Sequence, residues 1–402
     1  MDLPQELVDT ILDNIHDDVP SLKSCSLAAR TFVISARKHI FKKIEILSSS
    51  DAAQRFYELL CSSPHIAPLV EDLCITSVLE KFSVTCAYLD PSGDYMSGRA
   101  LSLILPLLTE LIRISIIETG DVHNRSGREF SRSWNKMEPP LQSVLANVFS
   151  SPRLEAVHLC GFVLESPCHL LSLFSEAAAL KEMSLSRLYF TQGEGRPEPW
   201  PESQLWRPKL QSLFLNVFST DLCQYLVNPH IDLTHVRTLT LATSLPEQRK
   251  KMVQATQFRL SRGVEHLGLY LSYNFEQTSY LFTTNLRSIH LHCNSMFELL
   301  GVFVQACPHD SRLEYVTLDT PAGVLHFTEI PELHTAIDAT VAHLPALKTI
   351  EIRWIVVEPS NAFTQWEVDI QTAFSSLVRR GMLHLTRIAW RGLGGLYPPG
   401  WE

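Results

Sequence analysis

The residues of this sequence with the clearest potential for chemistry are His290, His292 and Cys293, which follow one another closely. Histidines at positions i and i+2 of a strand share one face, and the carboxylate of Asp319 could join them there as a metal ligand. The sequence marks no fourth ligand, and this spacing does not recur elsewhere in the chain. We therefore expect neither a metal site nor a bound cofactor.

Motifs of catalysis and nucleotide binding are missing from the chain. It contains no G-x-S-x-G, no H-E-x-x-H, no G-x-G-x-x-G and no G-x-x-x-x-G-K-[ST], which mark hydrolases, zinc proteases, dinucleotide sites and phosphate loops. The 34 basic and 43 acidic residues give a net charge of -9, which argues against a general nucleic-acid binder. We therefore expect a non-catalytic protein that binds no nucleic acid.

The distribution of apolar residues also bears on location. The longest apolar run, residues 101–117, is interrupted by Glu110 and Arg113 and falls short of the roughly 20 residues that span a bilayer. The first residues lack the basic start and continuous apolar block of a signal peptide. The nine cysteines include no C-x-x-C pair, so they predict no zinc ribbon. We expect an intracellular protein of the cytoplasm or nucleus that does not bind membranes.

Leucine makes up roughly 15% of the chain, well above ordinary usage, and it recurs in the pattern L-x-x-L-x-L with any aliphatic residue allowed. Two early copies begin at Val70 and Leu111. From Leu154 onward the copies start at steps of 22 to 38 residues, mostly within or just beyond the roughly 20 to 29 residues of leucine-rich repeats. These later copies are Leu154/Val157/Leu159, Leu180/Met183/Leu185, Leu210/Leu213/Leu215, Val236/Leu239/Leu241, Val264/Leu267/Leu269, Leu286/Ile289/Leu291, Leu313/Val316/Leu318, Leu347/Ile350/Ile352 and Leu385/Ile388/Trp390.

Helix-like stretches lie between these strands, and several end at a proline, which cannot continue a helix. The repeating unit is therefore helix, turn, strand, and stacked units bury a continuous core. We expect an α/β fold in which residues 1–46 form a helical module, residues 47–68 a linker helix, and residues 69–402 a leucine-rich-repeat-like solenoid of parallel strands with outer helices. The alternative is an ordinary α/β domain, whose buried parallel strands are also rich in Leu.

In each repeat strand, positions 4 and 6 point into the core, so positions 3, 5 and 7 point to the opposite, concave face. The C-terminal repeats carry the larger polar side chains there, including Tyr and Arg, which are enriched at interface hot spots. We expect this face to bind a target protein, although a merely solvated face is the alternative. The candidate target-binding residues are His266, Tyr270, His290, His292, Tyr315, Asp319, Glu351, Arg353, Arg387 and Arg391.

The first 46 residues predict three short helices, over residues 3–15, 21–29 and 32–44. Apolar side chains of the first helix fall on one face, and Asp17-Asp18-Val19-Pro20 ends it. About 45 residues cannot supply a self-sufficient core. The apolar stripes of these helices must therefore be covered by the neighbouring domain or by another protein.

These helices resemble the F-box family, and in particular fungal F-boxes. The resemblance rests on Leu3-Pro4 with Glu6-Leu7, then Ile11-Leu12, Leu22, Cys25-Ser26-Leu27, Arg30 and His39-Ile40-Phe41. It covers about 45 residues of the chain. Phe32 stands where the family usually has Trp, and Asp17-Asp18 replaces a stretch that is more apolar in many members. We expect the second departure to loosen the turn into the second helix.

The resemblance implies that the module binds the Skp adaptor of a Skp–cullin–F-box ubiquitin ligase, while the repeats hold the protein to be modified. The chain would then be a substrate-recognition subunit, and the chemistry would belong to other subunits. The alternative is a repeat scaffold without a role in a ligase. Carried over by position, the adaptor-contacting candidates are Leu3, Pro4, Leu7, Ile11, Leu22, Cys25, Leu27 and Phe32. For Leu12, Ile40 and Phe41 we expect internal packing instead.

Overall fold

The computed structural model describes residues 3–47, 50–78, 98–119, 132–191, 206–216, 231–243, 263–271, 285–293, 311–321, 344–356 and 374–389, with residues 222, 226, 335, 341–342, 367–368 and 371–372. The chain forms two compact units. The first unit holds residues 1–165 and 169–180, and the second holds residues 166–168 and 181–402. Both units are built from parallel strands, and the first also contains an N-terminal helical region.

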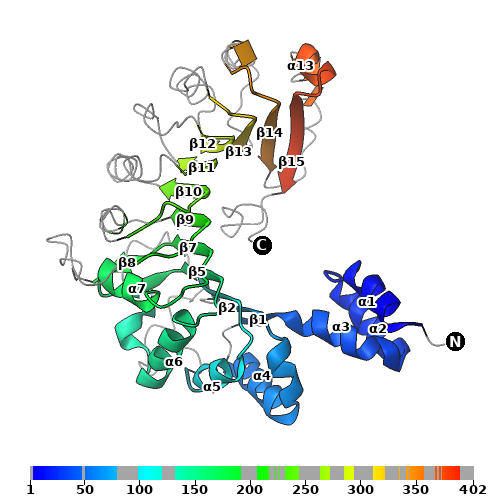
Figure 1. Cartoon of the computed structure of the whole chain (residues 1–402), viewed down its shortest axis with the longest axis vertical. Coiled ribbons are helices and arrows are strands. Elements are labelled where there is room, and N and C mark those ends of the chain that lie inside the picture. The colour runs from blue at the N-terminus through cyan, green and yellow to red at the C-terminus, as the bar shows by residue number, and fades with distance from the viewer. Residues whose placement is uncertain are drawn as a thin grey trace, which may run out of the picture. The chain divides into compact units, whose positions relative to one another are not determined.

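The N-terminal region consists of helices α1 (Gln5–Asp13), α2 (Val19–Ala28) and α3 (Arg30–Lys42) (Figure 1). Pro4 precedes α1, and its carbonyl accepts the amides of Leu7 and Val8 at 3.1 and 3.2 Å. The Asp18 carboxylate accepts the backbone N–H of Ser21 at 3.1 Å and caps α2, as Asp does at helix N-termini. The expectation that Asp17-Asp18 loosens this turn is therefore wrong, because Asp18 begins the helix.

A small core joins the three helices. Val8 and Leu12 of α1, Leu22 of α2 and Ala36 of α3 are fully buried. Four partly buried side chains pack against them: Ile15, Cys25, Phe32 and Ile40. The internal packing expected for Leu12 and Ile40 is confirmed, and Phe41 is partly buried.

In the first unit, strands β1 (Lys43–Leu47), β2 (Asp72–Val78), β3 (Arg113–Thr119) and β5 (Ala156–Cys160) pair in parallel in that order. Strand β1 was not expected, since the sequence predicted helix up to residue 44 and a linker helix from residue 47. Ile44 pairs with Leu73, and Ile46 pairs with Ile75. Together with Phe41 they complete one more copy of the aliphatic pattern, so the repeats begin at the end of α3.

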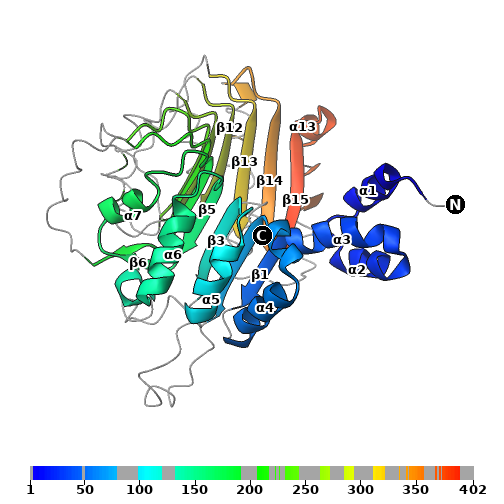
Figure 2. The same ribbon diagram turned by 60° about the horizontal axis from the view of Figure 1, so that its bottom comes forward.

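Helices α4 (Ser50–Ser62), α5 (Gly98–Ile104) and α6 (Pro139–Phe149) lie side by side along one side of these strands (Figure 2). Short 3-10 turns follow or precede them, namely η1 (Pro64–Leu69), η2 (Leu105–Leu107) and η3 (Trp134–Lys136). Strand β4 (Arg132–Ser133) pairs in parallel with β6 (Phe162–Leu164), and α7 (Pro167–Leu173) follows. The helix, turn, strand unit is thus confirmed in this part of the chain.

In the second unit, the parallel strands also follow in chain order, and every strand predicted from Leu180 onward is present. They are β7 (Glu182–Ser186), β9 (Ser212–Asn216), β10 (Thr238–Thr243), β11 (His266–Leu271), β12 (Ser288–Cys293), β13 (Tyr315–Pro321), β14 (Thr349–Val356) and β15 (Leu383–Ala389). Strand β8 (Tyr189–Phe190) and helix α13 (Ser375–Arg379) complete the described elements. Most of the helices predicted between residues 221 and 342 lie outside the described residues.

The aliphatic positions of the repeats make the core of this sheet. Leu267, Ile289 and Val316 stand in register on β11, β12 and β13, and all are buried. Where most of these strands begin, one backbone carbonyl accepts two N–H groups from the next repeat: the Arg237 carbonyl accepts those of Glu265 and His266 at 2.8 and 2.9 Å. This paired contact lies at the start of the strands and fixes their register there.

Charged side chains alternate in sign at these same turn positions. Arg237 and Arg287 flank Glu265, with nitrogen-to-oxygen distances of 3.7 and 3.6 Å. Further along, Lys348 lies 2.7 Å from Glu314. We call this row the charge ladder.

The register of the last repeat differs from the prediction. Leu383 and Leu385 pair with Ile350 and Ile352, so Leu385 occupies the third aliphatic position of its repeat and not the first. The predicted step of 38 residues to this repeat was therefore too long. Leu385 and Ile388 have the same three-residue spacing as the first two aliphatic positions of the pattern.

Candidate functional site

The N-terminal helices expose large apolar side chains. Leu3, Leu7 and Ile11 are 50%, 52% and 47% exposed. Leu7 and Ile11 lie four residues apart and share one face of α1, and Leu3 lies just before the helix. We call these three residues the apolar row. Pro4 is also exposed beside it. Four of the predicted adaptor contacts are thus exposed, on α1 and just before it.

The remaining adaptor candidates divide into two groups. Leu27 is 88% exposed at the end of α2, as a contact residue requires. Leu22 is fully buried in the helical core, so the prediction that it contacts the adaptor is wrong: its side chain already packs against α1 and α3. Cys25 and Phe32 are partly buried against the same core.

Sequence reasoning missed Ile34, which is 79% exposed on α3. The F-box pattern gave no reason to select it. A signal was available, because Phe32, Ala36 and Ile40 follow the spacing of an inward face, and Ile34 lies off that face.

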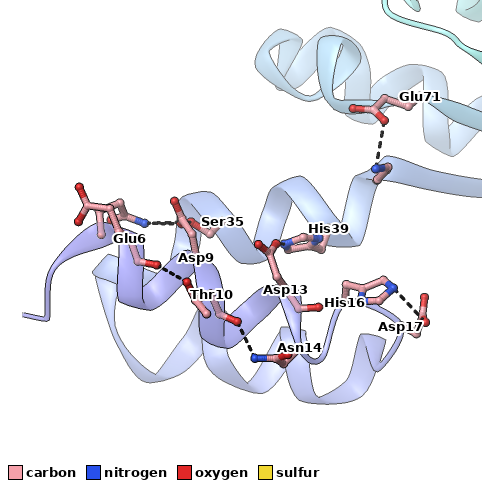
Figure 3. A network of polar contacts seen from close by, with 12 residues as sticks. Glu6, Asp9, Thr10, Asp13, Asn14, His16, Asp17, Ser35, His39 and Glu71 are labelled. Carbon is pink, nitrogen blue, oxygen red and sulfur yellow. Dashed lines mark hydrogen bonds and ion pairs between the residues drawn. The ribbon is translucent and has the colours of Figure 1, made fainter.

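Polar side chains connect α1 to α3 (Figure 3). The Gln5 amide nitrogen donates to Asp9 Oδ1 and to Ser35 Oγ, both at 2.9 Å, and the Ser35 hydroxyl donates to Asp9. One turn further, His39 Nε2 lies 3.0 Å from Asp13 Oδ1. The Ser35 hydroxyl, with the Gln5 amide, lowers the pKa of Asp9 by hydrogen bonding to its charged form. We call these five residues the polar seam.

A second cluster lies on the face of β11 to β13 predicted to bind a target. His290 Nε2 lies 2.8 Å and His292 Nδ1 lies 3.5 Å from Asp319 Oδ2. The Tyr270 ring stacks on His292 and meets the edge of His290, and its hydroxyl lies 3.3 Å from His290 Nδ1.

This cluster is buried, and the burial shapes its electrostatics. Only 7% of the Asp319 side chain is exposed. Burial alone would raise the pKa of Asp319, but the neighbouring His290 and His292 outweigh it and lower that pKa to about 2. Burial, together with the charge of Asp319, raises the pKa of Tyr270. Asp319 therefore stays charged and Tyr270 stays neutral at ordinary pH.

An ion pair continues the cluster onto β14. Arg353 Nη2 lies 2.9 Å from Glu351 Oε2, and the Thr386 hydroxyl donates to Glu351 Oε1 at 2.9 Å. Burial opposes ionisation of Glu351, yet these two partners lower its pKa. Six of the predicted target-binding residues, with Thr386, thus engage one another.

The other predicted target-binding residues are separate from this cluster. His266 is exposed and lies 2.7 Å from the Ser288 hydroxyl, and Tyr315 is 44% exposed. Arg387 pairs with Trp354, while Thr386 pairs with Arg353. Because successive side chains on a strand alternate, the predicted placement of Arg387 beside Arg353 on the concave face is wrong. Arg391 lies outside the described residues.

Among the described residues, no group of three or more His, Cys, Asp or Glu side chains has the arrangement to hold a metal ion. In the same part of the chain, no helix combines the length and the apolar character needed to cross a bilayer. The apolar row is one of several exposed apolar surfaces, with Leu103 and Leu107 also 43% and 40% exposed. Exposed apolar side chains of this size gain free energy when a partner covers them.

Comparison with known proteins adds no assignment. No protein-family model matches the sequence. No curated protein matches it significantly.

Proposed function

We propose that this chain is the substrate-recognition subunit of a Skp–cullin–F-box type ubiquitin ligase. In this role α1 to α3 bind the Skp adaptor, and the parallel-strand repeats bind the protein to be modified. The chain supplies no chemistry of its own, and ubiquitin transfer belongs to other subunits. The observation that carries the proposal is the apolar row of Leu3, Leu7 and Ile11, on α1 and just before it.

The apolar row supports adaptor binding because its side chains lie where the F-box resemblance puts adaptor contacts. Leu3, Leu7 and Ile11 are each about half exposed, while Val8 and Leu12 already fill the core of the module. Adding a partner surface would bury apolar area worth about 25 cal/mol per Å². Leu27 and Ile34 add exposed apolar area on α2 and α3.

The repeats support target binding in a more general way. Parallel strands stacked in order give an extended surface, which repeat proteins commonly use to bind other proteins. The exposed side chains His266 and Tyr315 belong to that surface. The identity of the target is not encoded by a short motif.

The decisive experiment is a binding measurement between the full chain and a purified Skp adaptor. We expect retention of the adaptor by the wild-type chain, and a loss of affinity of about 100-fold for the double variant Leu3→Asp with Leu7→Asp, since two charges would have to be buried. A matched control is Leu103→Asp on α5, because Leu103 is 43% exposed and lies outside the module. This control should bind as the wild type does.

Failure of the wild-type chain to bind any Skp adaptor would contradict the ligase proposal and leave the repeat-scaffold alternative. Equal binding by the wild type and the double variant would show that the adaptor contacts another surface. Circular dichroism of each variant separates a lost contact from a lost fold.

A further inference from the structure

Helix α1 has two apolar rows of similar composition, and only one of them can be buried. Leu7 and Ile11 form part of the apolar row, while Val8 and Leu12 fill the core. In a helix, successive residues are about 100° apart. A rotation of α1 by one residue would therefore bring Leu7 and Ile11 to the core and move Val8 and Leu12 to the position of Asp9 and Asp13.

Hydrophobic burial alone discriminates poorly between these two orientations. The exposed row offers Leu and Ile and the buried row offers Val and Leu, so the apolar area gained is similar in both cases. What differs is the next row, Asp9 and Asp13, which lies about 100° beyond the buried row.

This next row is tied to α3 at two points. Asp9 accepts from the Ser35 hydroxyl, and Asp13 lies 3.0 Å from His39 Nε2. Ser35 is only 7% exposed, and the His39 side chain is 15% exposed. Rotation of α1 would remove both carboxylates and leave the buried Ser35 and the partly buried His39 without these partners, which is costly for a buried polar group.

We propose that the polar seam between α1 and α3 sets the rotation of α1 and thereby places the apolar row outward, so that Asp9, Asp13, Ser35 and His39 are positioning residues for adaptor docking. They touch no adaptor themselves. This inference rests on the proposed function for its consequence, but the rotation of α1 can be measured without an adaptor.

The test compares two double variants that each remove two polar side chains from this region (Figure 3). The first, Ser35→Ala with His39→Ala, removes the α3 half of the seam and leaves α1 unchanged in sequence. The second, Thr10→Ala with Asn14→Ala, removes hydrogen bonds that stay within α1, since Thr10 donates to the Glu6 carbonyl and Asn14 donates to the Thr10 carbonyl.

The first readout is the rate at which a maleimide labels a cysteine placed on α1, followed at that site by mass spectrometry. With the seam intact, Leu7→Cys is labelled faster than Val8→Cys, because residue 7 is exposed and residue 8 is buried. We expect loss of both seam contacts to reduce the ratio of these rates about tenfold, the factor that about 1.4 kcal/mol represents. The second double variant should leave the ratio unchanged.

The second readout is affinity for a purified Skp adaptor, which we expect to fall about tenfold in the first double variant and less than about twofold in the second. The exchanged pair Asp13→His with His39→Asp should restore the wild-type values. If the first double variant loses its helical signal, His39→Gln alone provides the same comparison. An unchanged labelling ratio overturns the seam proposal. If the wild-type chain binds no adaptor but the first double variant still shows the changed labelling ratio, only the proposed function is overturned.

Discussion

In the N-terminal helices, apolar side chains lie in solvent, whereas in the strands of the second unit charged side chains lie buried. Leu7 is 52% exposed, while the Asp319 side chain is 7% exposed. Both regions depart from the usual distribution of apolar groups inside and charged groups outside. The departures differ in one respect. Asp319 faces two histidines within the chain, whereas the side chains of the apolar row stay about half exposed to solvent.

This difference indicates where a binding partner is needed. In the buried cluster, His290 and His292 face Asp319 Oδ2 and lower the pKa of Asp319, while Asp319 Oδ1 has no hydrogen-bond partner among the described residues. The apolar row gains free energy only when another surface covers it. The buried polar cluster therefore belongs to the folded sheet, and the exposed apolar row is the surface on which the proposed adaptor binding depends.

Replacement of Asp319 gives the largest expected effect on stability. Asp319→Ala leaves His290 and His292 without the carboxylate that they face, and breaking a buried charged pair costs about 4 kcal/mol of unfolding free energy. Urea denaturation at neutral pH measures this loss. A loss below about 1 kcal/mol, typical of an exposed pair, would show that the cluster is solvated and would break the comparison.

A second buried polar group makes the stability of the first unit depend on pH. His158 on β5 is 5% exposed, and burial lowers its pKa to about 4 from an ordinary value of 6.5. The unfolded chain therefore binds more protons between these two values, so this contribution to stability is complete above pH 6.5 and is lost as the pH falls toward 4. The expected loss is about 3 kcal/mol.

The variant His158→Gln isolates this effect. Because it cannot titrate in this range, its unfolding free energy should fall less than that of the wild type between pH 6.5 and 4, as followed by urea denaturation at a series of pH values. Parallel curves for the two proteins would mean that His158 titrates normally in the folded state.

Leu12 and Leu7 on α1 form a matched pair, which tests whether one stabilises the core and the other contacts the adaptor. Leu12 is fully buried and Leu7 is half exposed, so the same change to Ala should cost about 2 to 3 kcal/mol at Leu12 and less than about 0.5 kcal/mol at Leu7. Hydrogen exchange of the α1 amides reports this local stability. Only Leu7→Ala should weaken adaptor binding while the helix remains folded, and equal losses of stability would remove the distinction between the two rows.

The smallest effect is expected in the charge ladder, whose members are partly exposed. Glu265 lies within 3.7 Å of Arg237 and 3.6 Å of Arg287, and Glu265→Gln should cost less than about 1 kcal/mol. The cost should vanish near 1 M salt, where charges are screened over about 3 Å. If the loss of unfolding free energy persists in high salt, the ion pairs of the charge ladder behave like those of the buried cluster and not like surface pairs.

The repeating pattern predicted the sheet well because its information is local. Leu267, Ile289 and Val316 were expected in the core and are buried in register. Side chains alternate along a strand, so spacing alone assigns them to a face. The pattern failed at Leu385, because Leu385 and Ile388 have the three-residue spacing of the first two aliphatic positions, and at β1, where a helical interpretation competed for Ile44 and Ile46.

The candidate site was less predictable from the sequence. The family resemblance selected Leu3, Leu7 and Ile11 as adaptor contacts, and these residues are exposed, but it also selected Leu22, which is buried in the helical core. Helical spacing shows which residues share a face, but not which of two apolar faces another helix covers. That choice depends on α3, whose Ser35 and His39 lie about 26 residues further along the chain than their partners.

The sequence by itself determined the α/β class, the order of the strands and their aliphatic core, because these follow from residue spacing and from the period of the repeat. Only the tertiary structure decided that Asp319 is buried between two histidines, that Arg387 leaves the predicted face, and that α1 turns Leu7 outward and Leu12 inward. The physical reason is that burial and charge pairing depend on contacts between segments distant in the chain, and local spacing does not specify them.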